Sequence, residues 1–348
     1  MSASPLKFDE EYCLEIFERL AAVDSTTGQY EEIQKLVCQI LDEIGASYQI
    51  TRKGGVIAPL GEGGDPAVVT AHLDDLGLMV RHVNSDGTLK VCPIGGLLPF
   101  YCIAANVRVH TRDGKIYTGT VRRVPSSTHV SGEELRKAEP DFRKNVCATL
   151  DEEVKSAADV AALGIAAGDF IALEPETVIR NGFIKSRFID DKACAAALLA
   201  LIRAAKQAGV SPNRKVYMYF AMYEEIGHGT TWLPEDTKDV IAVDIAPTGP
   251  EQTSDEHKVS IFALDSRFPF HNGLTNELRR TAIESGVDWV VDVFTPAYGT
   301  DADASVLAGY DVRHAAVGPG TSNTHGYERT HVSALKNTHD LLAAYLFN

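Results

Sequence analysis

Apolar residues along the chain fall into two kinds of pattern. Helical spacing of apolar positions marks five segments, residues 8–22, 30–44, 193–208, 275–285 and 334–347. Short continuous apolar runs, which are typical of strands buried on both faces, occupy residues 66–71, 215–222, 239–243, 259–263, 289–294 and 314–317. Strands that alternate with helices in this way predict an α/β sandwich.

The pattern changes between about residues 84 and 182. Short β-like segments alternate with turns there, and the pairs Asp86-Gly87 and Asp113-Gly114 are hairpin signals. We therefore expect residues 84–182 to form an inserted β-rich domain. Residues 1–83 and 183–348 are expected to form the larger α/β domain that the insertion splits.

Charge and cysteine content exclude some functions. The 348 residues carry 33 Lys and Arg against 48 Asp and Glu, a net charge of −15, which opposes binding to nucleic acid or to an anionic membrane. The six cysteines form no CxxC pair, so we expect free thiols in a reducing compartment. The N-terminus does not resemble a signal peptide, and no apolar run approaches the ~20 residues of a membrane span. A cytoplasmic protein is expected.

Polar side chains that bind metals follow several of the predicted strands. In open α/β sheets, ligands bind outside the carboxyl ends of the strands, so these side chains are expected to lie close together. Two acidic residues at a predicted helix start and a histidine in a late loop complete the collection. Its members are His72, Asp74, Asp190, Asp191, Glu224, Glu225, Asp244 and His325.

This collection of side chains suits a pair of divalent cations. Two histidines and three carboxylates are typical ligands for two ions such as Zn²⁺, with one carboxylate shared between them. Two ions ~3.5–4 Å apart can together polarise a substrate and activate water. A further carboxylate must then move the proton of that water, and the adjacent Glu224 and Glu225 offer one base and one ligand. The nucleophile and phosphate motifs GxSxG, GxxxxGK[ST] and GxGxxG are absent from the sequence.

Five motifs resemble those of the tetrahedral (TET) aminopeptidases, metallopeptidase family 42. They are AHLDDLG at 71–77, IDDK at 189–192, EEIG at 224–227, VD at 243–244 and GTDA at 299–302. The resemblance extends from about residue 15 to the C-terminus. It implies a three-layer α/β/α sandwich with a mixed sheet, like other Zn-dependent exopeptidases. It also implies that the insertion is a small β-barrel-like dimerisation domain.

The resemblance implies a role for each candidate site residue. The metal ligands would be His72, Asp190, Glu225, Asp244 and His325, with Asp190 shared between two divalent cations per subunit. Zinc is the expected metal, with cobalt or manganese as alternatives.

Two further residues have implied catalytic roles. Glu224 would be the general base, and Asp74 would hold the second ring nitrogen of His72. The partners implied are short peptide substrates and further copies of the chain, in a dimer-based homo-oligomer such as a dodecamer.

The sequence departs from the family pattern in the last histidine motif and after the glutamate pair. The C-terminal loop contains His325 and His331, and His325 is preferred because Glu328 follows it in the order that the family shows. His228 replaces part of the usual glycine-leucine-arginine-glycine stretch, and contact with substrate, stabilisation of the developing oxyanion or a surface turn would explain it. The segment 265–271 also diverges and is a candidate for shaping the specificity pocket.

The expected function is a metal-dependent aminopeptidase that removes N-terminal residues from short peptides. A related dinuclear metal deacylase or carboxypeptidase acting on N-acyl amino acids is the main alternative. A glycosidase with two carboxylates needs no metal and leaves His72 unexplained, and a non-catalytic assembly protein leaves the whole set of ligands and base unexplained.

Overall fold

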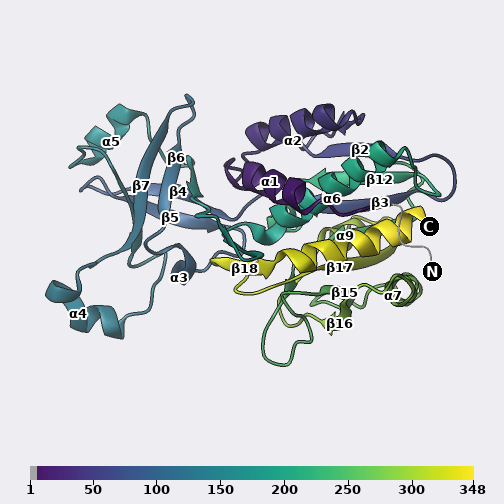
Figure 1. The fold of residues 1–348 in the computed structure, drawn as a ribbon. Helices are drawn as coiled ribbons and strands as arrows, with labels where there is room; N and C mark the ends of the chain where they lie inside the picture. The colour runs from purple at the N-terminus through teal and green to yellow at the C-terminus, as the bar shows by residue number, and fades with distance from the viewer. Residues whose placement is uncertain (1–5) are drawn as a thin grey trace. The chain divides into compact units, whose positions relative to one another are not determined.

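The computed structural model describes residues 6–348, which form two compact units. One unit contains the chain up to Asp74 and from Glu176 onward, and the other is Asp75–Pro175. Figure 1 labels their elements. Among the described residues, no helix has the length and apolar character that a membrane crossing requires.

A mixed sheet of nine strands forms the centre of the first unit. Its strand order is β1-β2-β12-β3-β13-β17-β15-β16, with β14 beside β17. Neighbours from β12 to β17 run parallel. Strand β2 runs antiparallel to β1 and β12, and β15 runs antiparallel to β17 but parallel to β16. The bounds are β1 Gln49–Ile50, β2 Val56–Leu60, β3 Ala67–His72, β12 Val216–Ala221, β13 Asp239–Val243, β14 Ala246–Pro247, β15 Val259–Leu264, β16 Trp289–Val293 and β17 Arg313–Thr321.

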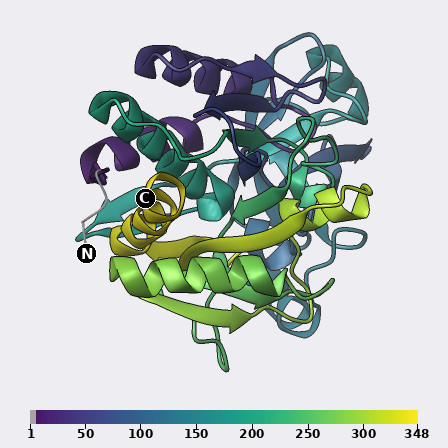
Figure 2. The same cartoon turned by 90° about the vertical axis from the view of Figure 1, so that its right-hand side faces the viewer.

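Helices cover both faces of this sheet. Alternate strand residues belong to two separate apolar clusters, as the period of a strand requires. The larger cluster includes residues of five helices, among which α7 and α9 lie side by side in Figure 2. These helices are α1 Glu10–Ala21, α2 Glu31–Ile44, α6 Ile189–Ala208, α7 Asn272–Ser285 and α9 Val332–Phe347. Helix α8, Asp301–Leu307, contacts the opposite face, which confirms the predicted three-layer sandwich.

The regular part of helix α6 begins close to the residue that the apolar spacing predicts. The structure assigns it from Ile189, four residues before the predicted start, but Asp190 and Asp191 have non-helical backbone angles. The regular part of the helix therefore lies beyond them, where the spacing predicts it. It ends at Ala208 and is capped by Gly209, whose φ of 65° is a left-handed conformation that glycine adopts easily.

The second unit is built on a closed barrel of six strands, as the fold prediction expects of the insertion. The strand order is β4-β5-β8-β7-β6-β9, and pairing of β4 with β9 closes the barrel. The strands are β4 Gly77–Val83, β5 Leu89–Ile94, β6 Asn106–His110, β7 Ile116–Arg123, β8 Val146–Leu150 and β9 Phe170–Leu173. Short helices connect them, namely α3 Pro99–Cys102, α4 Thr128–Lys137 and α5 Ala157–Leu163.

Candidate metal centre

Three neighbouring parallel strands end together at the candidate site. In the sheet, β3 lies between β12 and β13, so their carboxyl ends meet at one edge. His72 is the last residue of β3, and Asp244 directly follows β13. Glu224 and Glu225 follow β12 in a short 3-10 helix, η1, which spans Glu224–Ile226.

Two candidate residues reach this edge from outside the sheet. Asp190 lies at the start of α6, and His325 lies in the loop between β17 and β18, Glu328–His331. Strand β18 belongs to a small sheet with β10, Val178–Arg180, and β11, Phe183–Ser186. Because β11 precedes α6 and β18 follows the histidine loop, this small sheet joins the two segments that carry Asp190 and His325.

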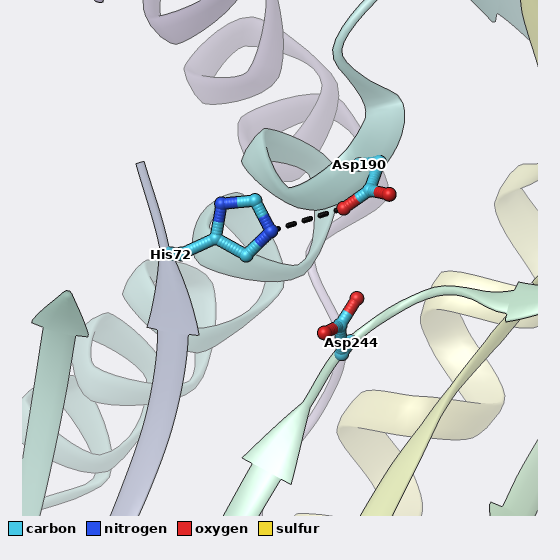
Figure 3. A group of neighbouring side chains, drawn as sticks. All are labelled: His72, Asp190 and Asp244. Carbon is cyan, nitrogen blue, oxygen red and sulfur yellow. Dashed lines mark hydrogen bonds and ion pairs between the residues drawn. The ribbon is translucent and has the colours of Figure 1, made fainter. Parts of the chain in front are cut away.

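His72, Asp190 and Asp244 form a first group of possible metal ligands. One ligand atom from each lies within 4.8 Å of the others, and all three residues are buried. Their side chains approach one another from β3, α6 and the end of β13 (Figure 3). The His72 Nε2 atom is 3.0 Å from Asp190 Oδ1.

A second group shares Asp190 with the first and adds Glu225 and His325. The His325 Nε2 atom lies 3.6 Å from an oxygen of Asp190 and 3.6 Å from an oxygen of Glu225. The alternative His331 belongs to neither group of the described residues. Its ring accepts a hydrogen bond from the Ser333 backbone N–H at the start of α9, at 3.1 Å.

The orientation of His72 fits a cation in the first group. Its Nδ1 atom is 3.0 Å from the backbone oxygen of Asp74, which can only accept, so this nitrogen carries a proton. Nε2 lies 3.0 Å from Asp190 Oδ1, where an imidazolium donates a proton to the carboxylate and a neutral ring presents the lone pair that a cation would bind. Ligand atoms around one Zn²⁺ ion lie ~3.3 Å apart, given bond lengths of ~2.0–2.1 Å. A cation would therefore satisfy both atoms.

The electrostatics of the carboxylates also fit bound cations. Burial and the charge of Asp190 raise the pKa of Asp244 to about 8. Burial, together with neighbouring carboxylates, raises the pKa values of Asp191, Glu224 and Glu225 well above their usual range. Burial alone would lower the pKa of His72, but its hydrogen bond to Asp190 and the charge of Glu224 raise it. Divalent cations among these groups would stabilise the carboxylates in their charged form.

Asp74 connects the histidine to the glutamate pair. Its carboxylate accepts hydrogen bonds from the backbone N–H groups of Glu224 at 3.0 Å and Glu225 at 3.3 Å, and from the Thr27 hydroxyl at 2.7 Å. The ring of His72 contacts the Asp74 backbone oxygen more closely than the carboxylate, which is 3.6 Å away. The carboxylate thus fixes the turn that carries both glutamates.

His228 has contacts that account for its position without a ligand. Its ring stacks on Tyr223, with centroids 5.0 Å apart and planes inclined at 20°. The Lys53 ammonium lies 3.4 Å from its Nδ1 atom and donates to its backbone oxygen. These contacts hold the turn after Glu225 against the segment that contains Lys53.

Two charged residues that were not among the candidate ligands border the site, and one of them, Arg267, lies in the segment 265–271 that was expected to shape the specificity pocket. Asp301 is buried and accepts the Thr230 backbone N–H at 3.0 Å, and a methyl group placed on Gly229 would lie only 2.1 Å from its carboxylate. The guanidinium of Arg267 lies against Gly227 and Gly299, 3.1 and 3.0 Å from the positions of added methyl groups. Asp301 stands in the GTDA motif, whereas no motif marked Arg267.

Comparison with known proteins places these residues in a family context. The family model described as M42 glutamyl aminopeptidase matches residues 54–341. The Bacillus subtilis protein named "Putative aminopeptidase YhfE" is 36% identical over 338 residues, 96% of each chain. A lysyl aminopeptidase of Pyrococcus furiosus is 30% identical over 219 residues, 61% of this chain and 60% of its own.

A solved structure shares the fold over nearly the whole length. The Pyrococcus horikoshii TET1 peptidase, described as able to assemble into a tetrahedron or a large octahedral shell, superposes with a TM-score of 0.84 at 21% identity. The match covers 97% of this chain and 99% of that one.

Proposed function

The chain belongs to the M42 glutamyl aminopeptidase family, and we propose that it removes N-terminal residues from short peptides with two divalent cations bound at the edge of its sheet. The observation that carries this proposal is the pair of ligand groups that share Asp190. Each group combines carboxylates with one histidine. A shared carboxylate between two such groups is the arrangement expected of a dinuclear centre.

The proposed ligands divide between the two positions. His72, Asp190 and Asp244 would hold one cation, and Asp190, Glu225 and His325 the other. The mixture of imidazole and carboxylate ligands suits Zn²⁺ and is also compatible with Co²⁺ or Mn²⁺. When bound, the cations would polarise the peptide carbonyl and lower the pKa of the attacking water.

Glu224 is the proposed general base. Its carboxylate belongs to neither ligand group of the described residues, yet it lies 3.7 Å from His72 Nε2, beside the first one. A carboxylate in this position can accept a proton from water and donate it to the leaving amine. The hydrogen bond from the Glu224 backbone N–H to Asp74 would keep its side chain directed at the reacting atoms.

Assembly and location are also proposals. We infer a homo-oligomer built from dimers, since a structure with the same fold assembles into closed shells. The barrel unit, expected from the sequence to be the dimerisation domain, would supply the dimer contact. All six cysteines are free, which supports the expected cytoplasmic location because that compartment keeps thiols reduced.

Substitution of the two glutamates tests the assignment of base and ligand. We expect Glu224→Gln to abolish hydrolysis of aminoacyl-peptides while metal analysis still finds two cations per subunit. Glu225→Gln should lose cation binding at the second position. If Glu224→Gln loses a cation and Glu225→Gln does not, the two roles are exchanged.

Metal removal and substrate choice test the reaction itself. EDTA should abolish activity, and added Zn²⁺ or Co²⁺ should restore it. Activity that survives complete metal removal would refute a metal-dependent reaction. A panel of peptides with free and N-acetylated amino termini distinguishes the alternatives, because an aminopeptidase requires the free amine and a deacylase requires the acyl group.

A further inference from the structure

Glu328 is a buried carboxylate beside the candidate metal centre that belongs to neither ligand group. It is the first residue of β18, and only 1% of its surface is exposed. Pairing of β18 with β11 places it opposite Ser186, shortly before the chain enters α6. The fold thus directs its side chain between two segments that are distant in the sequence.

The two carboxylate oxygens of Glu328 hold the backbones of two candidate ligands. Its Oε2 atom accepts the Asp190 N–H at 3.0 Å, and its Oε1 atom accepts the His325 N–H at 3.0 Å. The bond from Asp190 is buried and the bond from His325 is partly buried, so loss of the acceptor for Asp190 would leave a buried N–H group without compensation from solvent. One side chain therefore sets the spacing between residues 190 and 325.

His325 has an unusual backbone conformation that the hydrogen bond to Glu328 helps to stabilise. Its φ of 62° is in the left-handed region, which is unfavourable for a residue with a side chain. Such a conformation persists when surrounding contacts fix it. The hydrogen bond to Glu328 is a contact of this kind, and it acts on the residue whose imidazole faces Asp190 and Glu225.

We propose that Glu328 is a positioning residue that fixes Asp190 and His325 relative to each other and thereby sets the divalent-cation affinity of the Asp190–Glu225–His325 group. The inference rests on the proposed function, because it assumes that this group binds a cation. Groups that orient metal ligands commonly change metal affinity by about 10–100-fold when they are removed.

The effect should be largest for the second cation position. At the first position, His72 and Asp244 are placed by β3 and β13, and neither bonds to Glu328 in the described contacts. At the second position, two of the three ligands depend on Glu328 directly. Loss of hydrogen bonds to Glu328 should therefore lower the cation affinity of the second position more than that of the first.

Two substitutions change the acceptors of Glu328 in different ways. Glu328→Gln keeps the size of the side chain but leaves one acceptor atom, because the amide nitrogen only donates, and so releases one of the two N–H groups. Glu328→Asp keeps both acceptors on an arm one methylene shorter. The aspartate variant should therefore recover part of what the glutamine variant loses, and it serves as the second variant if Glu328→Gln does not fold.

A buried carboxylate remote from the ligands provides the matched control. Asp292 in β16 accepts the backbone N–H groups of Thr253 and Ser254, each at 2.8 Å, in the same unit of the chain. The second oxygen of Asp292 accepts the Val293 backbone N–H at 2.8 Å. Asp292→Asn, like Glu328→Gln, therefore removes the charge and one of two acceptor oxygens, at a position that bonds to no candidate ligand among the described residues. It should lower the melting temperature without altering cation binding.

Titration of metal-free protein with Zn²⁺ by isothermal calorimetry tests the proposal. The native protein should bind two ions, and Glu328→Gln should bind the second about 10–100-fold more weakly, with a smaller loss at the first, where Asp190 is the single ligand that Glu328 holds. With Co²⁺, the visible absorption of the second ion should change in Glu328→Gln and partly recover in Glu328→Asp.

Native affinity for both ions in Glu328→Gln would overturn the inference and leave the proposed function intact. Equal weakening in Asp292→Asn would also overturn it, since the effect would then reflect general loss of stability. A native protein that binds fewer than two ions would overturn the dinuclear function and this inference together.

Discussion

Gly229 offers a direct way to move the glutamate turn by a known distance. A methyl group at this position would lie 2.1 Å from Asp301 Oδ1, so reaching a contact of 3.0 Å requires a shift of about 0.9 Å, from 3.0 − 2.1. The φ of Gly229 is not in the left-handed region, so alanine adds a contact without backbone strain. Gly229→Ala must therefore displace either the Asp301 carboxylate or the turn that follows Glu225.

The size of the expected effect follows from this shift. A misplacement of about 1 Å in catalytic groups costs on the order of 100-fold in rate, and extra volume in a packed site costs about 1–3 kcal/mol of stability. We expect Gly229→Ala to lower kcat for an aminoacyl anilide by about 100-fold. The free energy of unfolding should fall by about 1–3 kcal/mol.

A second glycine in the same unit provides the control. Gly249 has only the Gln252 side chain near an added methyl group, at 4.0 Å, and no left-handed φ. Gly249→Ala should keep native kinetics and native stability in urea denaturation. If Gly229→Ala kept kcat within about twofold of the native value, the turn would not need its present position, and the argument from Asp301 would be refuted.

Two further predictions concern stability and specificity. Asp239 is fully buried and pairs with Arg214 at 2.6 Å and Arg313 at 2.7 Å. Asp239→Asn should lower the free energy of unfolding by about 2–3 kcal/mol, measured by urea denaturation at pH 7. This loss is smaller than that for a fully buried pair because both arginines are partly exposed. Burial raises the pKa of Asp239, but the two arginines lower it by more, so the pKa is lower in the folded protein than in the unfolded chain, where it is about 3.9. The stability that the carboxylate contributes is therefore present above a pH of about 4 and is lost as the pH falls further, so the stability difference between native protein and variant should shrink below that pH. A difference that stays constant with pH would contradict this pairing. The guanidinium of Arg267 lies against Gly227, next to the glutamate pair, where it could bind a substrate carboxylate. We expect Arg267→Ala to lower kcat/KM for N-terminal glutamate by about 10–100-fold and for leucine by less than about threefold. Equal losses for the two substrates would exclude recognition of a substrate carboxylate.

The fold was predictable because its central strands are buried on both faces. Continuous apolar runs such as 66–71 and 239–243 carry a signal that needs no tertiary information, and β3 and β13 lie within one residue of them. Helix α4 was not predicted, because none of its residues is buried and a charged, exposed segment has no apolar periodicity. Sequence pattern therefore identifies the elements that contribute to a core.

The candidate site shows a different limit. Residues directly after strands, such as His72 and Asp244, could be named because the strand ends share one edge of the sheet. The contacts of Glu328 and Asp301 could not be foreseen, because each bonds to the backbone of a residue far away in the sequence. Every amino acid except proline supplies the same backbone N–H group, so the sequence of the partner segment carries almost no sign of the bond.

The sharing of Asp190 between the two proposed cation positions would affect how the enzyme gains its activity. The candidate ligands come from five separate segments that lie between residues 72 and 325, and each position needs at least three of these segments in place. Contacts between such distant segments form late in folding, because the closure of long loops is entropically costly. An incompletely folded chain presents only isolated weak ligands, so the proposed metal centre would assemble, and hydrolysis begin, only when folding is complete.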